Sequence, residues 1–128
     1  MNTQKKFKVL IVDDEKGYVD VLANRLKRRG FDVDKAYSGV SAIEKLRKID
    51  FDIAILDLKM EDMDGIEVLK IFKKVMPQMQ VVMVTGHGSS EAATKGIEYG
   101  AFDYLAKPCE FSELLETIKK ALKIKDAV

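Results

Sequence analysis

Apolar runs and segments of helical periodicity alternate about five times along the chain, and no internal repeat interrupts them. Continuous apolar runs predict buried strands at residues 7–12, 52–56 and 80–84. Segments 31–36 and 101–106 mix apolar with polar residues, which is typical of strands at the edges of a sheet. The pattern therefore predicts five strands, of which the second and the fifth are edges.

The segments that follow these strands place apolar residues three and four positions apart, as one buried helix face requires. Each segment is bounded by residues that commonly start or stop helices. The expected helices run from Glu15 to Gly30, from Ser38 or Ser41 to Ile49, from Gly65 to a point before Pro77, from Ser89 or Ser90 to Gly100, and onward from Pro108.

Strands that alternate with helices pair in parallel through right-handed crossovers, and the helices then cover both faces of the sheet. Placing the apolar strands inside and the mixed strands outside gives the strand order 2-1-3-4-5. The sequence thus predicts an α/β fold, a doubly wound (βα)5 flavodoxin-like three-layer sandwich. In this order the chain winds in opposite directions from the first and third strands, so a ligand crevice opens at their carboxyl ends.

Composition sets mild limits on function. At 128 residues the chain has the size of a single domain, 1–128, and we expect its core to cover about residues 6–124. The 22 basic and 21 acidic residues nearly cancel, which gives no electrostatic reason to expect binding of nucleic acid or of a membrane. No apolar stretch reaches the length of a membrane span, and the single cysteine, Cys109, fits a reducing compartment. We expect a cytoplasmic location and a buried, space-filling role for Cys109.

Residues with phosphoryl or metal chemistry follow four of the predicted strands. Asp13 and Asp14 follow the first strand, Asp57 follows the third, Thr85 ends the fourth, and Lys107 follows the fifth. Because parallel strands end at the same edge of a sheet, these groups should converge on one crevice. Carboxylates held close together repel one another when ionised, and a hard cation such as Mg²⁺ offsets that repulsion. The arrangement predicts a metal-assisted phosphoryl site.

Each residue type then has a separate chemical task. An uncovered aspartate at a strand end can act as a nucleophile and form an aspartyl phosphate, which predicts this role for Asp57. Lys107 offers a compact positive charge to one phosphoryl oxygen, and Thr85 offers a hydroxyl donor to another.

These residues, in this order and at these strand ends, resemble the receiver domain of two-component response regulators, a CheY-like superfamily, over nearly the whole chain. The resemblance implies that Asp57 is the phosphoacceptor. It further implies that the carboxylates of Asp13, Asp14 and Asp57 bind Mg²⁺ together with the backbone carbonyl of Lys59, with Mn²⁺ as a substitute. It also implies that Thr85 and Lys107 contact the phosphoryl group, and that Tyr104 turns inward as Thr85 moves. A cis peptide bond is implied at Pro108. Lys59 and His87 are expected to control the lifetime of the phosphate.

The same resemblance implies the partners. A histidine kinase or a histidine phosphotransfer protein would donate the phosphoryl group, and the surface of the fourth helix, fifth strand and last helix would change to control an output domain or protein. A phosphorylation-dependent dimer belongs to this expectation, whereas direct nucleic-acid binding and turnover of a substrate do not. Such a chain acts as a switch rather than as an enzyme.

One segment departs from the family pattern. After Lys59 and Met60 the family commonly has Pro-Gly, whereas this chain has Glu61 and Asp62. A rigid turn is replaced by a flexible, acidic one. The simpler interpretation is a solvated loop without a special task, and the functional alternative is that its charge alters metal affinity or phosphate lifetime.

Three other interpretations stay open. A flavin-binding module has this fold, but its cofactor phosphate would meet carboxylates here, and absence of flavin colour would argue against it. A metal-dependent phosphohydrolase would need a second acid two residues after Asp57, where Lys59 stands. The third is a receiver-like interaction module that works without phosphorylation. His87, beside glycines, also has the simpler interpretation of a solvated surface residue.

Overall fold

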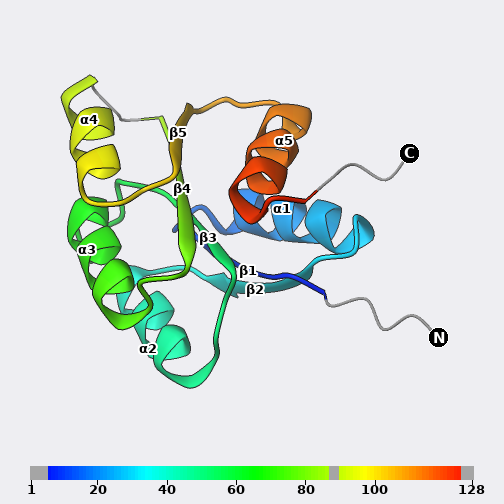
Figure 1. Cartoon of the computed structure of the whole chain (residues 1–128), viewed down its shortest axis with the longest axis horizontal. Coiled ribbons are helices and arrows are strands. Elements are labelled where there is room, and N and C mark those ends of the chain that lie inside the picture. The colour runs from blue at the N-terminus through cyan, green and yellow to red at the C-terminus, as the bar shows by residue number, and fades with distance from the viewer. Residues whose placement is uncertain (1–5, 87–89, 125–128) are drawn as a thin grey trace.

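The computed structural model describes residues 6–86 and 90–124, which form one parallel sheet between two layers of helices (Figure 1). Helices α1 and α5 lie on one side of the sheet, and α2, α3 and α4 lie on the other. The elements, in chain order, are β1 Lys8–Val12, α1 Lys16–Arg28, β2 Asp32–Ala36, α2 Gly39–Lys48, β3 Ile53–Leu56, α3 Gly65–Val75, β4 Gln80–Thr85, α4 Ser90–Glu98, β5 Asp103–Ala106 and α5 Phe111–Leu122.

The strand order is β2-β1-β3-β4-β5, and every neighbouring pair is parallel. This confirms the predicted fold and the predicted order 2-1-3-4-5, with the two mixed strands at the edges. Central strands β1, β3 and β4 carry the continuous apolar runs because helices cover both of their faces.

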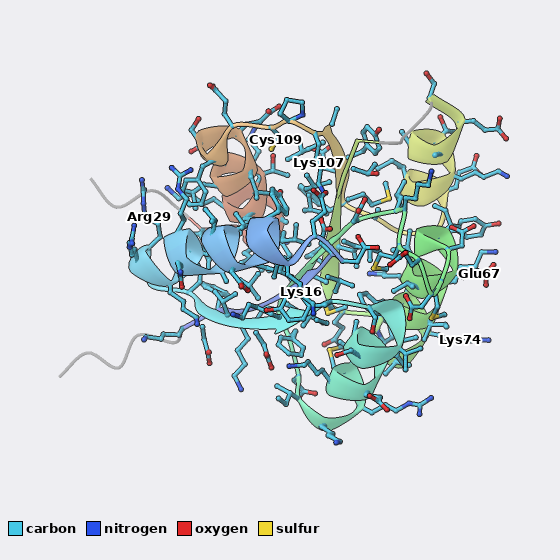
Figure 2. The ribbon with its side chains drawn as sticks, turned by 180° about the vertical axis from the view of Figure 1, so that it is seen from behind. Lys16, Arg29, Glu67, Lys74, Lys107 and Cys109 are labelled. Atoms are coloured by element: carbon cyan, nitrogen blue, oxygen red, sulfur yellow. The ribbon has the colours of Figure 1, made fainter. Side chains whose placement is uncertain are left out.

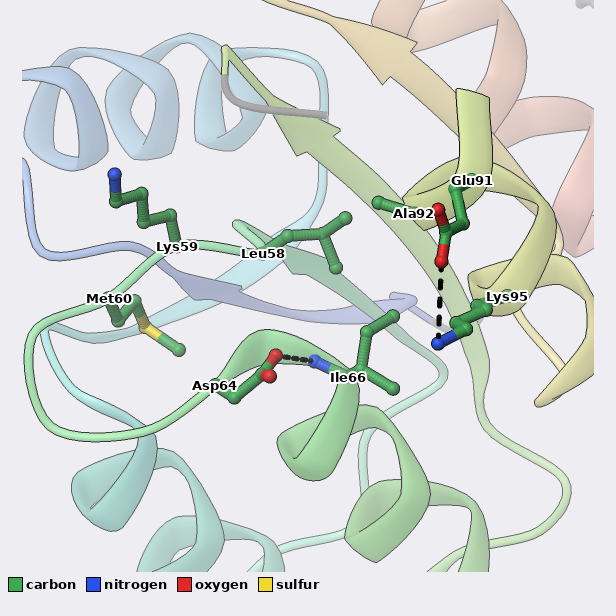
Figure 3. Close-up of a pocket in the computed structure, with 8 residues that line it drawn as sticks. All are labelled: Leu58, Lys59, Met60, Asp64, Ile66, Glu91, Ala92 and Lys95. Carbon is green, nitrogen blue, oxygen red and sulfur yellow. Dashed lines mark hydrogen bonds and ion pairs between the residues drawn. The ribbon is translucent and has the colours of Figure 1, made fainter. Parts of the chain in front are cut away.

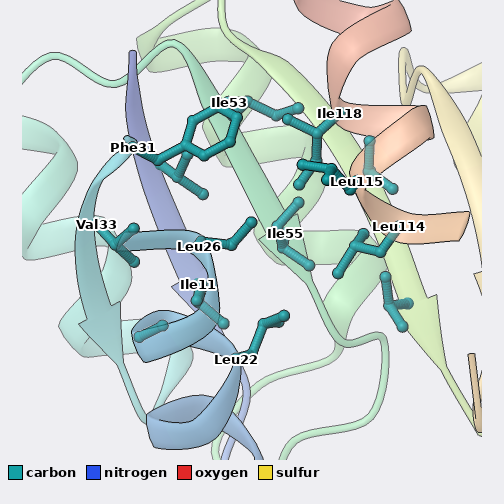
Figure 4. Close-up of a cluster of buried hydrophobic side chains, with 14 of the residues drawn as sticks. Ile11, Leu22, Leu26, Phe31, Val33, Ile53, Ile55, Leu114, Leu115 and Ile118 are labelled. Atoms are coloured by element: carbon teal, nitrogen blue, oxygen red, sulfur yellow. The ribbon is translucent and has the colours of Figure 1, made fainter. Parts of the chain in front are cut away.

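Alternation of side chains along the strands divides the core into two clusters. On β1, Val9 and Ile11 join the cluster beneath α1 and α5, whereas Leu10 and Val12 join the cluster beneath α2 and α3. Figure 4 shows the first cluster, in which side chains of α1 and α5 meet across β1 and β3. Because both faces of the sheet are packed in this way, the strand ends are held in a fixed order and register.

Each of the five strands begins or ends one or two residues away from the sequence expectation. Phe31 and Ala101 were expected in strands, but their N–H groups donate to the carbonyls of Leu26 and Gly96 and close the ends of α1 and α4. Strand β4 continues to Thr85, one residue beyond the predicted range. Glycines with positive φ, Gly30 at 93° and Gly100 at 105°, make both helix ends possible.

Helix starts near the strand ends are capped by side chains. The Ser38 hydroxyl accepts the N–H of Ser41 at 3.1 Å and starts α2, which decides between the two serines expected there. Asp64 accepts the N–H of Ile66 at 2.9 Å and starts α3. Gly65 follows because any Cβ there would overlap the Leu58 backbone, whose carbonyl accepts the Gly65 N–H at 2.8 Å.

Ser89 lies outside the described residues, which begin again at Ser90. Among the residues described, no helix is long and apolar enough to cross a bilayer.

Candidate functional site

Three carboxylates meet where β1 and β3 end side by side. One carboxylate oxygen from each of Asp13, Asp14 and Asp57 lies within 4.8 Å of the others. The register of the sheet produces this meeting, because Val12 pairs with Leu56 and the Asp57 N–H donates to the Val12 carbonyl at 3.0 Å. Asp13 and Asp57 are 2% and 5% exposed, so these acids line the floor of the crevice rather than its rim. The carboxylates predicted to converge do so.

This donor set fits a hard divalent cation. Carboxylate oxygens are the ligands that Mg²⁺ and Ca²⁺ prefer, and Mg²⁺ commonly takes one or two carboxylates and keeps several waters. Two nearly buried carboxylates and one half-buried carboxylate at such short range also concentrate negative charge that a cation would neutralise. The residues present could therefore hold a metal ion, and the chemistry of the oxygens points to a hard one.

Backbone N–H groups fix the orientation of each carboxylate. Oδ1 of Asp13 accepts the N–H of Glu15 at 3.0 Å, and Oδ1 of Asp57 accepts the N–H of Lys59 at 3.3 Å. Oδ2 of Asp14 accepts the N–H of Glu61 at 3.2 Å. Burial raises the pKa of Asp13, and the nearby charge of Asp57 adds to the rise, while Lys107 and the Glu15 N–H partly offset it.

Lys107 reaches into the same crevice from the end of β5. Its Nζ lies 2.7 Å from Oδ2 of Asp13, 2.8 Å from Oε1 of Glu15 and 3.8 Å from Oδ2 of Asp57. Burial alone would lower the pKa of Lys107, but the hydrogen bonds to Asp13 and Glu15 outweigh burial and hold the pKa above its ordinary value. The ammonium also lies 4.4 Å from the centre of the Tyr18 ring, and burial raises the pKa of Tyr18 to about 12. Lys107 is thus a positive charge over the acids.

Thr85 and Tyr104 share one face of the sheet. In the register of β4 and β5, Met83 pairs with Tyr104 and Thr85 pairs with Ala106. Because side chains alternate along a strand, Thr85 points to the same face as Met83, and Tyr104 packs against the cluster on that face. Thr85 is fully buried, and its carbonyl accepts the Lys107 N–H at 3.0 Å. The structure therefore brings Thr85 close to the strand that carries Lys107 and Tyr104.

The segment after β5 contains a cis peptide bond between Lys107 and Pro108, which is the geometry that the resemblance implies. Figure 2 shows this segment, with Lys107 and Cys109 labelled, beside the start of α1. Cys109 is half-buried and contacts the cluster beneath α1 and α5, so the expectation of a buried cysteine is wrong. The chain leaves the sheet edge at this point, which leaves the thiol only partly covered.

The positions expected to tune the phosphate lifetime have different outcomes. Lys59 is exposed next to Asp57 and lines a pocket of about 490 Å³ between the start of α3 and α4. Figure 3 shows Asp64 and Ile66 on one side of this pocket and the Glu91–Lys95 ion pair, 3.8 Å long, on the other. His87 lies outside the described residues. The roles of the Lys59 side chain and carbonyl stay predictions.

Sequence reasoning missed two contributors to the site. Glu15 and Tyr18 contact Lys107 from the start of α1, although each reads in the sequence only as part of a helix. Asp62 is exposed, as a solvated loop residue would be, but its carboxylate accepts the N–H groups of Gly39 and Val40, each at 3.0 Å. The sequence did not predict this contact with the start of α2.

Comparison with known proteins agrees with this geometry. The family described as "Response regulator receiver domain" matches residues 9–119. The chain belongs to this family. The receiver domain described here is 38% identical over 117 residues to the transcriptional regulatory protein ZraR of Salmonella typhimurium, covering 91% of this chain and 26% of that protein. It is 35% identical over 121 residues to the transcriptional regulatory protein GlrR of Escherichia coli K12, covering 94% of this chain and 27% of that protein.

Solved receiver structures share its fold. A CheY-like response regulator receiver domain protein from Methanospirillum hungatei JF-1 superposes with a TM-score of 0.91 at 34% identity, covering 93% of this chain and 95% of that one. The beryllofluoride-activated NtrC4 receiver domain dimer gives a TM-score of 0.86 at 35% identity, covering 91% of this chain and 96% of that one. This receiver domain spans about a quarter of the length of the curated relatives that it matches.

Proposed function

We propose that this receiver domain accepts a phosphoryl group on Asp57 from a histidine kinase or a histidine phosphotransfer protein. The observation that carries the proposal is the position of Asp57, 5% exposed after the end of β3, close to two other carboxylates and 3.8 Å from the Lys107 ammonium. A carboxylate so placed has acids that could hold a cation and a positive charge beside it. We further propose that Asp57 is a phosphoacceptor and that the chain turns over no separate substrate.

The transfer is a displacement at phosphorus. An oxygen of Asp57 attacks the phosphorus of a phosphohistidine, the new O–P bond forms, the P–N bond breaks, and the imidazole nitrogen takes up a proton. Lys107 lies within 3.8 Å of Asp57 and needs only a short movement to contact a phosphoryl oxygen. Thr85, at the end of the adjacent strand β4, would donate its hydroxyl to another oxygen.

Asp13, Asp14 and Asp57 would hold Mg²⁺, together with the backbone carbonyl of Lys59, and Mn²⁺ would substitute. When bound, the cation supplies positive charge that neutralises the phosphoryl oxygens. The support for Mg²⁺ over a larger cation is the small number of carboxylates, because Mg²⁺ keeps several of its waters. The three carboxylates would hold the cation, and their hydrogen bonds with backbone N–H groups restrict their rotation.

The phosphorylated state would favour a second conformation of one surface. Added negative charge on Asp57 attracts Lys107 and Thr85, and the space that Thr85 leaves favours an inward turn of Tyr104, which is half-buried against the α4 side of the sheet. The surface of α4, β5 and α5 changes with it and controls an output domain or protein. Phosphorylation shifts this population only by its differential stabilisation of the two states.

The relatives support the proposed output. ZraR and GlrR are transcriptional regulatory proteins several times longer than this chain, and the NtrC4 receiver domain is a dimer in its beryllofluoride-activated form. We propose that this domain likewise controls an output domain or partner protein, and that phosphorylation promotes a dimer.

Lys59 and His87 are proposed to tune the lifetime of the aspartyl phosphate. Lys59 is exposed beside Asp57 and can screen the phosphate from water. Unchanged hydrolysis of the phosphorylated protein in Lys59→Ala and His87→Ala variants would remove this part of the proposal.

The experiment that tests the function is intact-mass analysis after incubation with Mg²⁺ and a small acyl-phosphate donor. The expected result is gain of one phosphoryl group, abolished by Asp57→Asn and by metal chelation. A folded, metal-binding protein that gains no mass from this donor or from a kinase would instead support an interaction module that works without phosphorylation.

A further inference from the structure

The loop of residues 59–64 lies between the acidic site and the first turn of α2. We propose that Asp62 anchors this loop to α2 and thereby positions Asp14 for metal binding. The inference rests on the metal site of the proposed function and assigns a positioning residue to it. It concerns the same Glu61–Asp62 segment that departs from the family pattern.

One end of the link is the carboxylate of Asp62. Oδ1 accepts the N–H of Gly39 and Oδ2 accepts the N–H of Val40, each at 3.0 Å, so both oxygens bind the first turn of a helix more than 20 residues away in the sequence. These bonds lower the pKa of Asp62. Helix α2 already has a local cap from Ser38, which serves a different donor, the N–H of Ser41. Asp62 therefore does more than complete a helix cap, because it joins two separate segments.

The other end of the link is the neighbouring residue. The N–H of Glu61 donates to Oδ2 of Asp14 at 3.2 Å, and Asp14 is one of the three carboxylates whose oxygens meet within 4.8 Å. Glu61 is bonded directly to Asp62, so its backbone connects the α2 anchor to a predicted metal ligand. A shift of the backbone at Glu61 would move the N–H donor that orients Asp14.

The base of the loop is fixed independently of Asp62. Lys59 and Asp64 form an antiparallel bridge, and the Gly65 N–H donates to the Leu58 carbonyl at 2.8 Å. Met63 packs so closely against α2 that a Cβ at Gly39 would lie 2.9 Å from its sulfur. The Asp62 carboxylate adds two hydrogen bonds to α2 next to the tip of the loop, where Glu61 meets Asp14.

A partner that orients a metal ligand typically changes metal affinity by tenfold or more. We expect Asp62→Ala to weaken Mg²⁺ binding about tenfold in isothermal titration calorimetry of the phosphate-free protein. The amide signal of Glu61 should shift in the NMR spectrum of the same variant, because its N–H is no longer held toward the Asp14 carboxylate. Asp62→Asn keeps one acceptor oxygen for the α2 turn without the charge, so its loss of affinity should be smaller.

Ser38→Ala is the matched control. It removes a cap of the same helix without touching the loop, and caps of both kinds stabilise a helix by similar amounts. We expect Ser38→Ala to lower thermal stability about as much as Asp62→Ala while leaving Mg²⁺ affinity unchanged. Equal affinity loss in both variants would overturn the proposal, because Asp62 would then act only as a helix cap.

Other outcomes also decide the matter. Unchanged Mg²⁺ affinity in Asp62→Ala overturns the inference. A loss of affinity in Asp62→Ala without a shift of the Glu61 amide signal also overturns it, because the effect would then come from charge rather than from position. A wild-type protein that binds Mg²⁺ yet accepts no phosphoryl group contradicts the proposed function. The Mg²⁺ affinities of the wild type, Asp62→Ala and Ser38→Ala can still be compared in that case. The failures of the two proposals are therefore distinguishable.

Discussion

Nζ of Lys107 lies 2.7 Å from Oδ2 of Asp13, closer than to the carboxylate of Asp57, from which it is separated by 3.8 Å. A second hydrogen bond, to Glu15 at 2.8 Å, holds the ammonium toward the start of α1. Lys107 therefore lies beside the proposed phosphoacceptor without contacting it at hydrogen-bond distance. We expect phosphorylation of Asp57 to draw the ammonium away from at least one of these partners.

Of the hydrogen-bond partners of Lys107, Glu15 should contribute the least interaction free energy. Its side chain is 64% exposed, and exposed ion pairs contribute only about 0.2–1 kcal/mol. We predict that Glu15→Gln accelerates phosphorylation of Asp57 by a small acyl-phosphate donor about two- to fivefold, because Lys107 is released more readily. The measurement is the time course of intact mass at saturating Mg²⁺.

Asp20→Asn supplies the control for the Glu15 experiment. Asp20 also lies on the α1 segment, pairs with Lys35 at 3.1 Å, and its substitution changes net charge by the same amount. Its phosphorylation rate should match that of the unmodified sequence. Equal acceleration in both variants would show a general charge effect and contradict a specific role of Glu15 in holding Lys107.

Asp13 should make the acidic site sensitive to pH. Burial raises its pKa above the ordinary value of 3.8. The folded protein therefore binds the Asp13 proton more tightly than the unfolded chain does, so this group's contribution to the free energy of unfolding falls as pH rises from 3.8 through the folded pKa.

We predict that carbon-13 NMR of the metal-free protein shows the Asp13 carboxyl titrating above 3.8. Lys107→Met should raise this pKa further, since the ammonium lowers it in the intact protein. Mg²⁺ affinity should fall on acidification as this proton binds. An Asp13 titration at or below the ordinary value, or a lower value in Lys107→Met, would contradict the described electrostatics.

Helix α4 should have little room for a side chain at its buried glycine, because Met83 would have to move. Gly96 is the one buried residue of α4, and a Cβ there would overlap the sulfur and methyl group of the fully buried Met83. Overpacking of this kind costs about 1–3 kcal/mol, which exceeds the gain of about 1 kcal/mol from alanine's helix propensity. We predict that Gly96→Ala lowers the free energy of unfolding in urea denaturation.

Gly17→Ala is the matched helix substitution. A Cβ at Gly17 has no atom within 4 Å, so alanine should stabilise α1 by about 0.5–1 kcal/mol. Combining Gly96→Ala with Met83→Val should recover part of the loss, because valine lacks the overlapping atoms. If Gly96→Ala stabilised the protein as much as Gly17→Ala does, α4 would not pack closely against Met83.

The fold was predictable because the sheet sorts its strands by burial. Uniformly apolar strands fit the centre of a sheet that helices cover on both faces, whereas mixed strands such as residues 32–36 fit the sheet edge. The convergence of Asp13, Asp57 and Lys107 followed from the same order, since parallel strands end together. These inferences needed only the local pattern and one rule of topology.

Other features depend on contacts that a local pattern does not contain. The Asp62 anchor requires the first turn of α2 to lie beside the loop, and the Glu15 contact requires the start of α1 to face the end of β5. Strand limits at Phe31 and Ala101 were wrong because their N–H groups bind helix carbonyls instead of a neighbouring strand. The partial exposure of Cys109, which packs at the margin of the cluster beneath α1 and α5, is likewise absent from the local pattern.

Asp57, rather than a neighbouring acid, should receive the phosphoryl group. Borohydride reduction of the protein treated with Mg²⁺ and an acyl-phosphate donor converts a phosphorylated aspartate to homoserine, and peptide mass analysis then locates it. We expect homoserine at Asp57, dependent on Mg²⁺. Homoserine at Asp13 or Asp14, or its absence from a protein that has gained a phosphoryl group, would contradict the assignment of Asp57.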